Sequence, residues 1–268
     1  MAATTIELIV RLILSLLCAP CSCCQDPRHW TTSVSVDDAV GAPARLPFST
    51  IRKRIARHMV ASKATSPHVA MGVEVDLSSV AAARAGTGVG FLPFVAWSVC
   101  RAIEDFPRVN ATVDGDALAV FPTVDLGIAV DLDFEGLVVP VVRDAQALDL
   151  RALGDEVKRL SEAARSKQLS PDDVRGGTYT ISNVGSAGTL FTTPIINQPQ
   201  VAILSVDGIR KRPVAVEVDG RDEVAVHPVG VLVQSFDHRA FDGAYSAAFL
   251  DRVRTILETT PWSERMGG

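Results

Sequence analysis

Residues 233–249 read VQSFDHRAFDGAYSAAF, where an apolar, strand-like run passes into a helix-like run. Asp237, His238, Arg239, Asp242 and Gly243 lie within seven residues of one another there, in a chain that has only 5 histidines. The pattern predicts a corner between a strand and a helix, with an imidazole at the corner. One interpretation makes His238 a surface residue of a helix that Asp237 caps. The other makes it a catalytic base held by its surroundings.

The chemistry of His238 fits acyl transfer. An imidazole titrates near pH ~6.5 and is largely free to accept a proton at neutral pH. A thiol titrates near ~8.5 and becomes a good nucleophile only after it loses its proton. A positioned histidine therefore suits activation of a thiol or alcohol. Asp242 would lie on the same side as His238 if the turn is helical. The spacing does not decide whether its carboxylate hydrogen-bonds the ring.

A second stretch supplies hydroxyl groups. Residues 176–188 read GGTYTISNVGSAG and place Ser182 and Asn183 at the end of a strand-like run among glycines. A hydroxyl there can donate to an oxyanion, and losing one such donor typically costs ~10²–10³ in rate. The alternative is a turn whose serine and asparagine bond to local backbone groups.

The rest of the body predicts a mixture of helices and strands. Ser49 is the expected cap of a helix with an apolar stripe of Ile51, Ile55 and Met59. A hairpin is expected over residues 109–122. A helix is expected over 148–167, with Asp149 as its cap and Leu150, Leu153, Val157, Leu160 and Ala164 as its buried stripe. Residues 136–145 are nearly continuous valine, as in a strand covered on both faces. The pattern indicates an α/β or α+β fold with a mixed sheet flanked by helices.

Composition narrows the class of protein. Apolar residues make up 47% and charged residues 21% of the 268 residues, as in a globular enzyme. The net charge of −5 gives no basic surface for nucleic acid. One cysteine, Cys100, stands in the body, so a reducing cytoplasm is the expected compartment.

The first 45 residues are expected to be a tail and linker. Residues 6–24 read IELIVRLILSLLCAPCSCC, too short an apolar run for a membrane span and without the basic start of a secretory signal. An amphipathic arm and a start codon placed too far upstream both stay open. The cluster of Cys18, Cys21, Cys23 and Cys24 is a poor zinc site, because adjacent thiols strain a four-ligand geometry. No metal is expected.

The motif SFDHRAFDG resembles the D-H-R-x-x-D-G signature of the acyltransferase (E2) components of 2-oxo acid dehydrogenase complexes. Further stretches resemble that family's catalytic domain in its order: IRKRIARHM, SPH, FLPF, LGIAVDLDFEGLVVPVVRDA, GGTYTISNVGS and FTTPIINQPQVAIL. The resemblance covers residues 46–260. It places the catalytic domain at 46–262, between a tail at 1–45 and a tail at 263–268.

The resemblance implies a fold similar to chloramphenicol acetyltransferase, assembled as a homotrimer with active sites between subunits. His238 would deprotonate the thiol of coenzyme A or dihydrolipoamide, and Ser182 of a neighbouring subunit would hydrogen-bond the oxyanion. Asp242 would brace the loop through a salt bridge to Arg239, Arg52 or Arg57. The side chains that would bind the substrates are Asn183, Thr193, Asn197, Arg52 and Arg239.

The chain also departs from the family. The family's lipoyl domain carries a lysine, whereas the first 45 residues contain none, so another domain or chain would supply the lipoyl group. Its partners would be that lipoyl domain and the E1 and E3 components. The polar terminus TTPWSERMGG counts against cubic or dodecahedral cores.

The sequence leaves three alternatives to lipoyl acyl transfer. A stand-alone acyltransferase acting on a small diffusible acceptor and a non-catalytic structural core are the main alternatives. A Ser/His/Asp hydrolase is disfavoured, because no G-x-S-x-G elbow is present. The acyl group (acetyl, succinyl or branched-chain) is not fixed by the motifs.

Overall fold

The structure is a computed structural model that describes residues 44–185 and 188–266. Contacts within the chain divide it into Met1–Pro47 and Phe48–Gly268, and the predicted domain boundaries stay predictions. The cysteine cluster at residues 18–24 and Ser186 lie outside the described residues. Within the described ranges, no helix combines the length and apolar character that crossing a membrane requires.

The helices and strands are as follows. The α-helices are α2 (Thr50–Thr65), α3 (Ser78–Arg84), α4 (Leu92–Asp105), α5 (Leu150–Arg165), α6 (Gly243–Thr259) and α7 (Trp262–Met266), with single 3-10 turns at η4 (Pro107–Val109), η5 (Ala145–Ala147) and η6 (Asp172–Val174). The strands are β1 (His68–Asp76), β2 (Ala111–Asp114), β3 (Ala117–Val120), β4 (Leu126–Asp131), β5 (Leu137–Val138), β6 (Val141–Val142), β7 (Tyr179–Asn183), β8 (Ala202–Val206), β9 (Arg210–Val218) and β10 (Arg221–Asp237).

The main sheet is mixed, as predicted. Its strands follow the order β1-β10-β8-β7-β4-β5, with β6 paired to β4 and β9 paired to β10. The pairs β4–β7 and β7–β8 are parallel, and the others are antiparallel. The predicted hairpin forms as a separate two-stranded sheet of β2 and β3.

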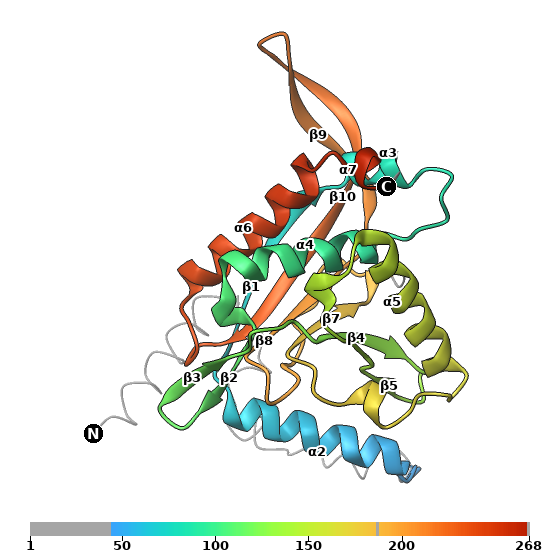
Figure 1. The fold of residues 1–268 in the computed structure, drawn as a ribbon, viewed down its shortest axis with the longest axis vertical. Helices are drawn as coiled ribbons and strands as arrows, with labels where there is room; N and C mark the ends of the chain where they lie inside the picture. Colours follow the sequence, from blue (N-terminus) through green and yellow to red (C-terminus); the bar gives the residue numbers. More distant parts are fainter. Residues whose placement is uncertain (1–43, 186–187, 267–268) are drawn as a thin grey trace, which may run out of the picture. The chain divides into compact units, whose positions relative to one another are not determined.

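Three helices bury the apolar side of this sheet. In Figure 1, α4, α5 and α6 lie together along the sheet, and their apolar faces form the core with side chains such as Phe94, Phe249 and Tyr179. Trp262 of α7 is 1% exposed and meets Phe94 and Trp97 edge to face, with ring centroids 5.2 and 5.6 Å away. The helical layer therefore packs against the sheet whose strands carry the candidate site residues.

The prediction for α5 is confirmed in detail. Asp149 accepts a hydrogen bond from the backbone N–H of Ala152 at 2.7 Å and so caps the helix. The buried residues of α5 are the predicted stripe, Leu150, Leu153, Val157, Leu160 and Ala164. Because the stripe recurs with the helical period, its burial follows from sequence alone.

The predicted helix capped by Ser49 is confirmed as α2, where the Ser49 side chain accepts from the Arg52 backbone N–H at 3.2 Å. Its apolar stripe is only partly covered: Ser62 is the helix's buried residue, and Ile51 is 38% exposed. The reason is that α2 packs against a loop, where the Ser62 hydroxyl donates to the carbonyl of Ile196 at 2.6 Å.

The prediction of a single strand for the valine-rich run is wrong. Pro140 has no N–H for a ladder and separates two-residue β5 from two-residue β6.

A series of buried hydrogen bonds connects three secondary-structure elements. Ser246 of α6 donates to Gln234 of β10 at 2.6 Å, and Gln234 donates in turn to the Tyr179 hydroxyl of β7 at 3.1 Å. All three side chains are buried, and burial raises the pKa of the Tyr179 phenol. These hydrogen bonds link β7 and β10, the two strands that carry the candidate site residues.

The end of the sheet carries a projecting hairpin. The first half of β10 pairs with β9, whereas its second half lies between β1 and β8. Figure 1 shows this β9–β10 hairpin extending away from the sheet.

Candidate active site

His238 lies at the predicted corner. Strand β10 ends at Asp237, directly opposite His68, the first residue of β1. The backbone N–H of His238 donates to the carbonyl of Pro67 at 3.0 Å, which fixes the main chain. Its side chain is 45% exposed and lies beside the Phe236 ring, with centroids 5.9 Å apart. The imidazole is therefore anchored on one side and accessible on the other.

Asp237 holds the corner through Arg239. Its nearly buried carboxylate accepts the Arg239 backbone N–H at 2.9 Å and its guanidinium at 2.6 Å. Burial acts to raise the pKa of Asp237, but hydrogen bonds from Arg239 and Ser66 outweigh it and hold the pKa below its usual range. The interpretation in which Asp237 caps the helix is wrong, because α6 begins at Gly243 with Asp242 at the cap position.

Asp242 does not form the expected salt bridge with an arginine in the described part of the chain. Arg239 is engaged by Asp237 instead. The Asp242 carboxylate is 85% exposed and lies 3.8 Å from His238 Nδ1, beyond hydrogen-bonding distance. The two side chains do share one side of the turn, as the four-residue spacing predicts.

Ser182 lies on β7, opposite Ala129 and Ser205. It is half-buried, and the next residue, Asn183, accepts a hydrogen bond from the Gly185 backbone at 3.3 Å. The hydroxyl-bearing strand end predicted from sequence is therefore present.

Ser182 and His238 are far apart within one chain. Ser182 pairs with Ser205, and Ser205 pairs with Val233 of β10. His238 follows five residues after Val233. At ~3.3 Å per residue and ~4.8 Å per strand, the two residues lie about 20 Å apart. One chain cannot bring this hydroxyl and this imidazole to the same reacting atom.

The loop after Ser182 is tied to the sheet by Asp207, which sequence reasoning missed. The buried Asp207 carboxylate accepts hydrogen bonds from the hydroxyls of Thr189, Thr192 and Ser205, and from the Thr192 backbone, at 2.8–3.1 Å. These bonds fix the start of the segment that contains Thr193 and Asn197. No short motif marks Asp207, because its partners come from three separate positions.

Two further histidines position the same loop. His68 Nε2 accepts from the backbone N–H of Ile196 at 3.1 Å, so His68 Nδ1 carries the proton that it donates to the Ser66 carbonyl at 2.8 Å. His58 Nε2 donates to Asn197 Oδ1 at 3.1 Å. The loop bearing Asn197 is thus held beside the start of β1, next to the His238 corner.

The predicted site residues do not share one cavity. A cavity of about 550 Å³ contains His238, Arg239 and Asp242, with Arg108 and Tyr245 at its wall. Thr193 lines a separate apolar cavity of about 340 Å³ beside β1, with Met71 and Phe191. Arg52 lies exposed on α2.

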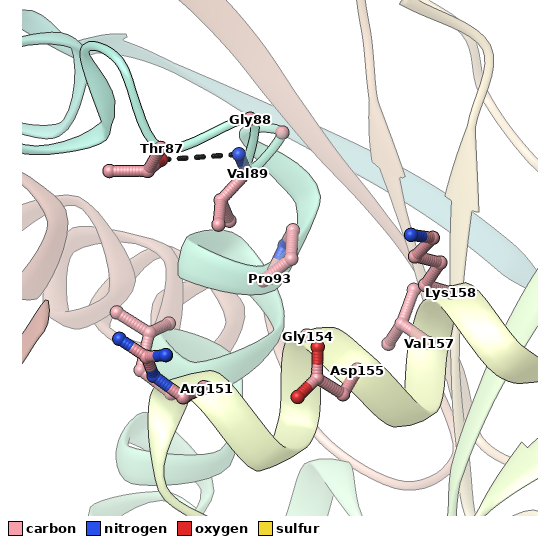
Figure 2. Close-up of a pocket in the computed structure, with 11 residues that line it drawn as sticks. Thr87, Gly88, Val89, Pro93, Arg151, Gly154, Asp155, Val157 and Lys158 are labelled. Carbon is pink, nitrogen blue, oxygen red and sulfur yellow. Dashed lines mark hydrogen bonds between the residues drawn. The ribbon is translucent and has the colours of Figure 1, made fainter.

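A further cavity of about 640 Å³ lies elsewhere. Figure 2 shows it between the loop at Thr87–Val89 and α5, with Arg151, Asp155 and Lys158 along the helix. None of the predicted site residues lines it. Cavity size therefore does not mark the His238 corner.

Cysteine and metal chemistry find no support among residues 44–185 and 188–266. Cys100 is buried, and burial raises the pKa of its thiol to about 12, so it is no thiolate nucleophile. No group of three or more metal-ligating side chains occurs in these residues.

Comparison with known proteins identifies first the fold and then the family. Chloramphenicol acetyltransferase superimposes with a TM-score of 0.52 at 14% identity, covering 75% of this chain and 94% of that one, so the two share a fold. The family described as 2-oxoacid dehydrogenases acyltransferase (catalytic domain) matches residues 41–263. The chain belongs to this family.

Curated relatives agree with this assignment. The succinyltransferase component of the 2-oxoglutarate dehydrogenase complex of Bartonella vinsonii subsp. berkhoffii is 39% identical over 224 residues, which is 80% of this chain and 53% of the relative. The acetyltransferase component of the pyruvate dehydrogenase complex of Staphylococcus aureus is 36% identical over 248 residues, which is 84% of this chain and 56% of the relative. The chain spans about half the length of these relatives.

Solved structures match over most of their length. A probable dihydrolipoamide acetyltransferase from Listeria monocytogenes gives a TM-score of 0.76 at 32% identity, covering 81% of this chain and 95% of that one. The Azotobacter vinelandii dihydrolipoamide acetyltransferase, studied for the role of a serine, a histidine and an asparagine in its mechanism, gives 0.74 at 30% identity. It covers 82% of this chain and 93% of its own.

Proposed function

We propose that this chain transfers an acyl group between dihydrolipoamide and coenzyme A. The observation that carries the proposal is the His238 corner, where a backbone-anchored, half-exposed imidazole projects from the end of β10. The membership of the chain in the acyltransferase family supports the same reaction.

The reaction needs one group that accepts a proton and one group that donates a hydrogen bond to the oxyanion. Neutral His238 removes the proton from the attacking thiol, and the thiolate adds to the carbonyl carbon of the thioester. Ser182 of a neighbouring subunit donates a hydrogen bond to the oxyanion. Collapse of the tetrahedral intermediate breaks the other carbon–sulfur bond, and the departing sulfur takes the proton back from His238.

Asp242 acts as a positioning residue in this scheme. Its carboxylate stands 3.8 Å from His238 Nδ1 and favours a ring orientation in which Nδ1 bears the proton. In the Azotobacter vinelandii enzyme the histidine and asparagine studied are likewise four residues apart. The Asp237–Arg239 pair supplies the bracing that sequence reasoning gave to Asp242.

The substrates approach along the loop held by Asp207 and His68. Thr193 and Asn197 line the path of the thiols, and Asn183 follows Ser182 at the oxyanion side. The exposed Arg52 lies on a helix that has no acidic residue and suits the phosphates of coenzyme A. The Arg239 guanidinium is paired with Asp237, so only the exposed part of this side chain, beside His238, is left to contact a substrate.

The functional unit is a homotrimer in which each active site combines Ser182 of one chain with His238 of the next. The separation of these residues within one chain supports this arrangement. The lipoyl group comes from a separate domain or chain, and the partners are the lipoyl domain and the E1 and E3 components. The expected compartment is the cytoplasm.

Direct turnover tests the reaction. The purified chain is incubated with acetyl-, succinyl- or isobutyryl-coenzyme A and dihydrolipoamide, and formation of S-acyl-dihydrolipoamide is followed. We expect turnover with one preferred donor, and a loss of at least ~10²-fold in His238→Ala. Absence of product with every donor, or full activity in His238→Ala, would sink the mechanism. Activity toward a small amine or alcohol instead would favour the stand-alone enzyme.

A further inference from the structure

The apolar cavity of about 340 Å³ beside β1 lies between the sheet and the loop that follows Ser182. Its lining includes Ala70, Gly72, Val231 and Val233 from β1 and β10, and Leu190, Phe191 and Thr193 from the loop. The volume is near the lower end of the range for small-molecule pockets. It therefore suits a small group better than a whole cofactor.

The cavity shares a face of the sheet with the Ser182 hydroxyl. Ser182 pairs with Ser205, and Ser205 pairs with Val233. Val233 pairs in turn with Gly72. Directly opposed residues of paired strands share a face, so these four residues form one row across β7, β8, β10 and β1. At ~4.8 Å per strand, Val233 lies about 10 Å from Ser182.

Gly72 keeps the strand side of the cavity free of a side chain. A methyl group at this position would lie 3.3 Å from Cγ2 of Val233 and 3.5 Å from the carbonyl oxygen of Leu232. The backbone does not require glycine here, because Gly72 lies inside the regular strand β1 and its φ is not positive. Glycine inside a strand often marks a place where a ligand approaches closely. The missing side chain therefore leaves room for a bound group.

The loop side of the cavity is held by Asp207. The Asp207 carboxylate accepts from the Thr189 hydroxyl at 2.8 Å and from the Thr192 backbone N–H at 3.1 Å. Leu190 and Phe191 lie between these two anchored residues, and their side chains are 60% and 61% exposed. They offer apolar surface that an apolar group would remove from water, which stabilises binding.

The lining disfavours a charged group. Among the described residues that line the cavity, Glu74 has the one charged side chain. Its Oε1 lies 2.7 Å from Nη1 of Arg212. A distal carboxylate, as in a succinyl group, would meet apolar side chains and this acid, with no cation in the lining to pair with it. Taking a carboxylate out of water without such a partner is costly.

We propose that this cavity holds the acyl chain of the thioester and selects branched apolar acyl groups, such as isobutyryl and isovaleryl, over acetyl and succinyl. The inference rests on the proposed function, which places the thioester carbonyl oxygen at Ser182. An acetyl group ends close to that oxygen, whereas a branched chain extends along the row toward Val233 and covers Phe191. Gly72 is the specificity-determining residue, because a side chain there would occupy the space of the branched end.

Donor preference of the full chain tests the cavity. We expect kcat/KM for isovaleryl-coenzyme A to exceed the values for acetyl- and succinyl-coenzyme A by ~10-fold or more, since one methylene in an apolar pocket is worth roughly 10–200-fold. Gly72→Ala should lower the isovaleryl value by ~10-fold and leave the acetyl value nearly unchanged. The matched control is Gly154→Ala on α5, whose methyl group would lie 3.5 Å from Pro93. It should change neither value.

A second variant enlarges the cavity instead of filling it. Val231→Ala should raise the ratio of hexanoyl to isovaleryl turnover by ~4-fold or more, which is the worth of one buried methylene. Thermal unfolding shows whether each variant is folded. A parent that prefers acetyl or succinyl donors overturns the proposal. So does a pair of folded variants whose donor ratios equal those of the parent.

Binding without turnover separates this proposal from the proposed function. In the absence of dihydrolipoamide the acyl group has no acceptor thiol, so isothermal titration calorimetry of the parent measures binding alone. Isovaleryl-coenzyme A should bind ~10-fold or more tightly than acetyl- or succinyl-coenzyme A, and Gly72→Ala should remove this difference. A parent with this contrast but no turnover contradicts the proposed function and leaves the cavity standing. A parent that turns over but binds the three donors equally contradicts the cavity alone.

Discussion

The Asp237 carboxylate lies 2.6 Å from the Arg239 guanidinium, two residues further along the chain. His238 lies between these two residues in the sequence. Because Arg239 folds back on Asp237, the main chain turns sharply after β10 and presents the imidazole outward. This short-range pair, rather than Asp242, shapes the His238 corner.

Asp237→Asn should therefore lower the free energy of unfolding. The amide keeps the shape but loses the charge-assisted bonds, at a cost of about 1–3 kcal/mol. Urea unfolding at pH 7 measures the loss. Asp242→Asn is the matched control, since that side chain is 85% exposed and caps no backbone N–H. It should change stability by less than ~0.5 kcal/mol.

The same pair predicts how stability depends on pH. The pKa of Asp237 is lower in the folded than in the unfolded chain. Its stabilisation is therefore complete above the unfolded value near ~3.9 and is lost as pH falls through the folded value. Unfolding curves between pH 3 and pH 7 should be less pH-dependent in Asp237→Asn than in the parent. Parallel pH curves would contradict this.

Mixing two inactive variants tests the shared site. Ser182→Ala and His238→Ala each remove one half, and co-expressed chains assort at random in trimers. About a quarter of the interfaces then pair an intact Ser182 with an intact His238, so about a quarter of parent activity should return. A site built within one chain would show no recovery beyond that of either variant alone.

His68→Ala should lower kcat/KM by roughly 10-fold or more, because the Ile196 backbone loses its acceptor and the loop bearing Asn197 shifts. Stability should fall by about 1–3 kcal/mol as well. Asp149→Ala is the control: it removes the cap of α5 at a cost of about 1 kcal/mol. It should leave kcat/KM unchanged. Equal kinetics in the two variants would show that His68 is merely structural.

Gln234→Leu should destabilise the chain by about 1–3 kcal/mol for each of the two hydroxyls, on Tyr179 and Ser246, that it leaves buried and unpaired. Urea unfolding of Gln234→Leu and of Gln234→Leu/Ser246→Ala separates the two contributions. The double variant should recover part of the loss. A neutral single variant would show that the buried hydrogen bonds add nothing to stability.

Sequence predicts those parts of the fold that local periodicity encodes. The α5 stripe, the β2–β3 hairpin and the strand-to-helix corner at His238 are confirmed, because spacing alone determines them. The side of α2 that is buried was not predicted, because it depends on the loop that the helix meets in space. The expected salt bridge between Asp242 and an arginine is absent from the described residues, where Arg239 pairs with Asp237.

Longer-range site contacts also escape a reading of the sequence. His68 and Ile196 are joined by one hydrogen bond across a separation of 128 residues. Asp207 gathers donors from three positions that share no motif. The separation of Ser182 from His238 follows from strand register, which pairs residues that no local pattern links.

The buried bonds among Tyr179, Gln234 and Ser246 have a geometric consequence. They span β7 and β10, so they set how far β10 may slide against the strands beside it. A slip of one residue would move His238 by ~3.3 Å and turn its side chain to the opposite face. In the proposed homotrimer, the strand register of each sheet would therefore set the distance between one pairing of Ser182 with His238 and the next.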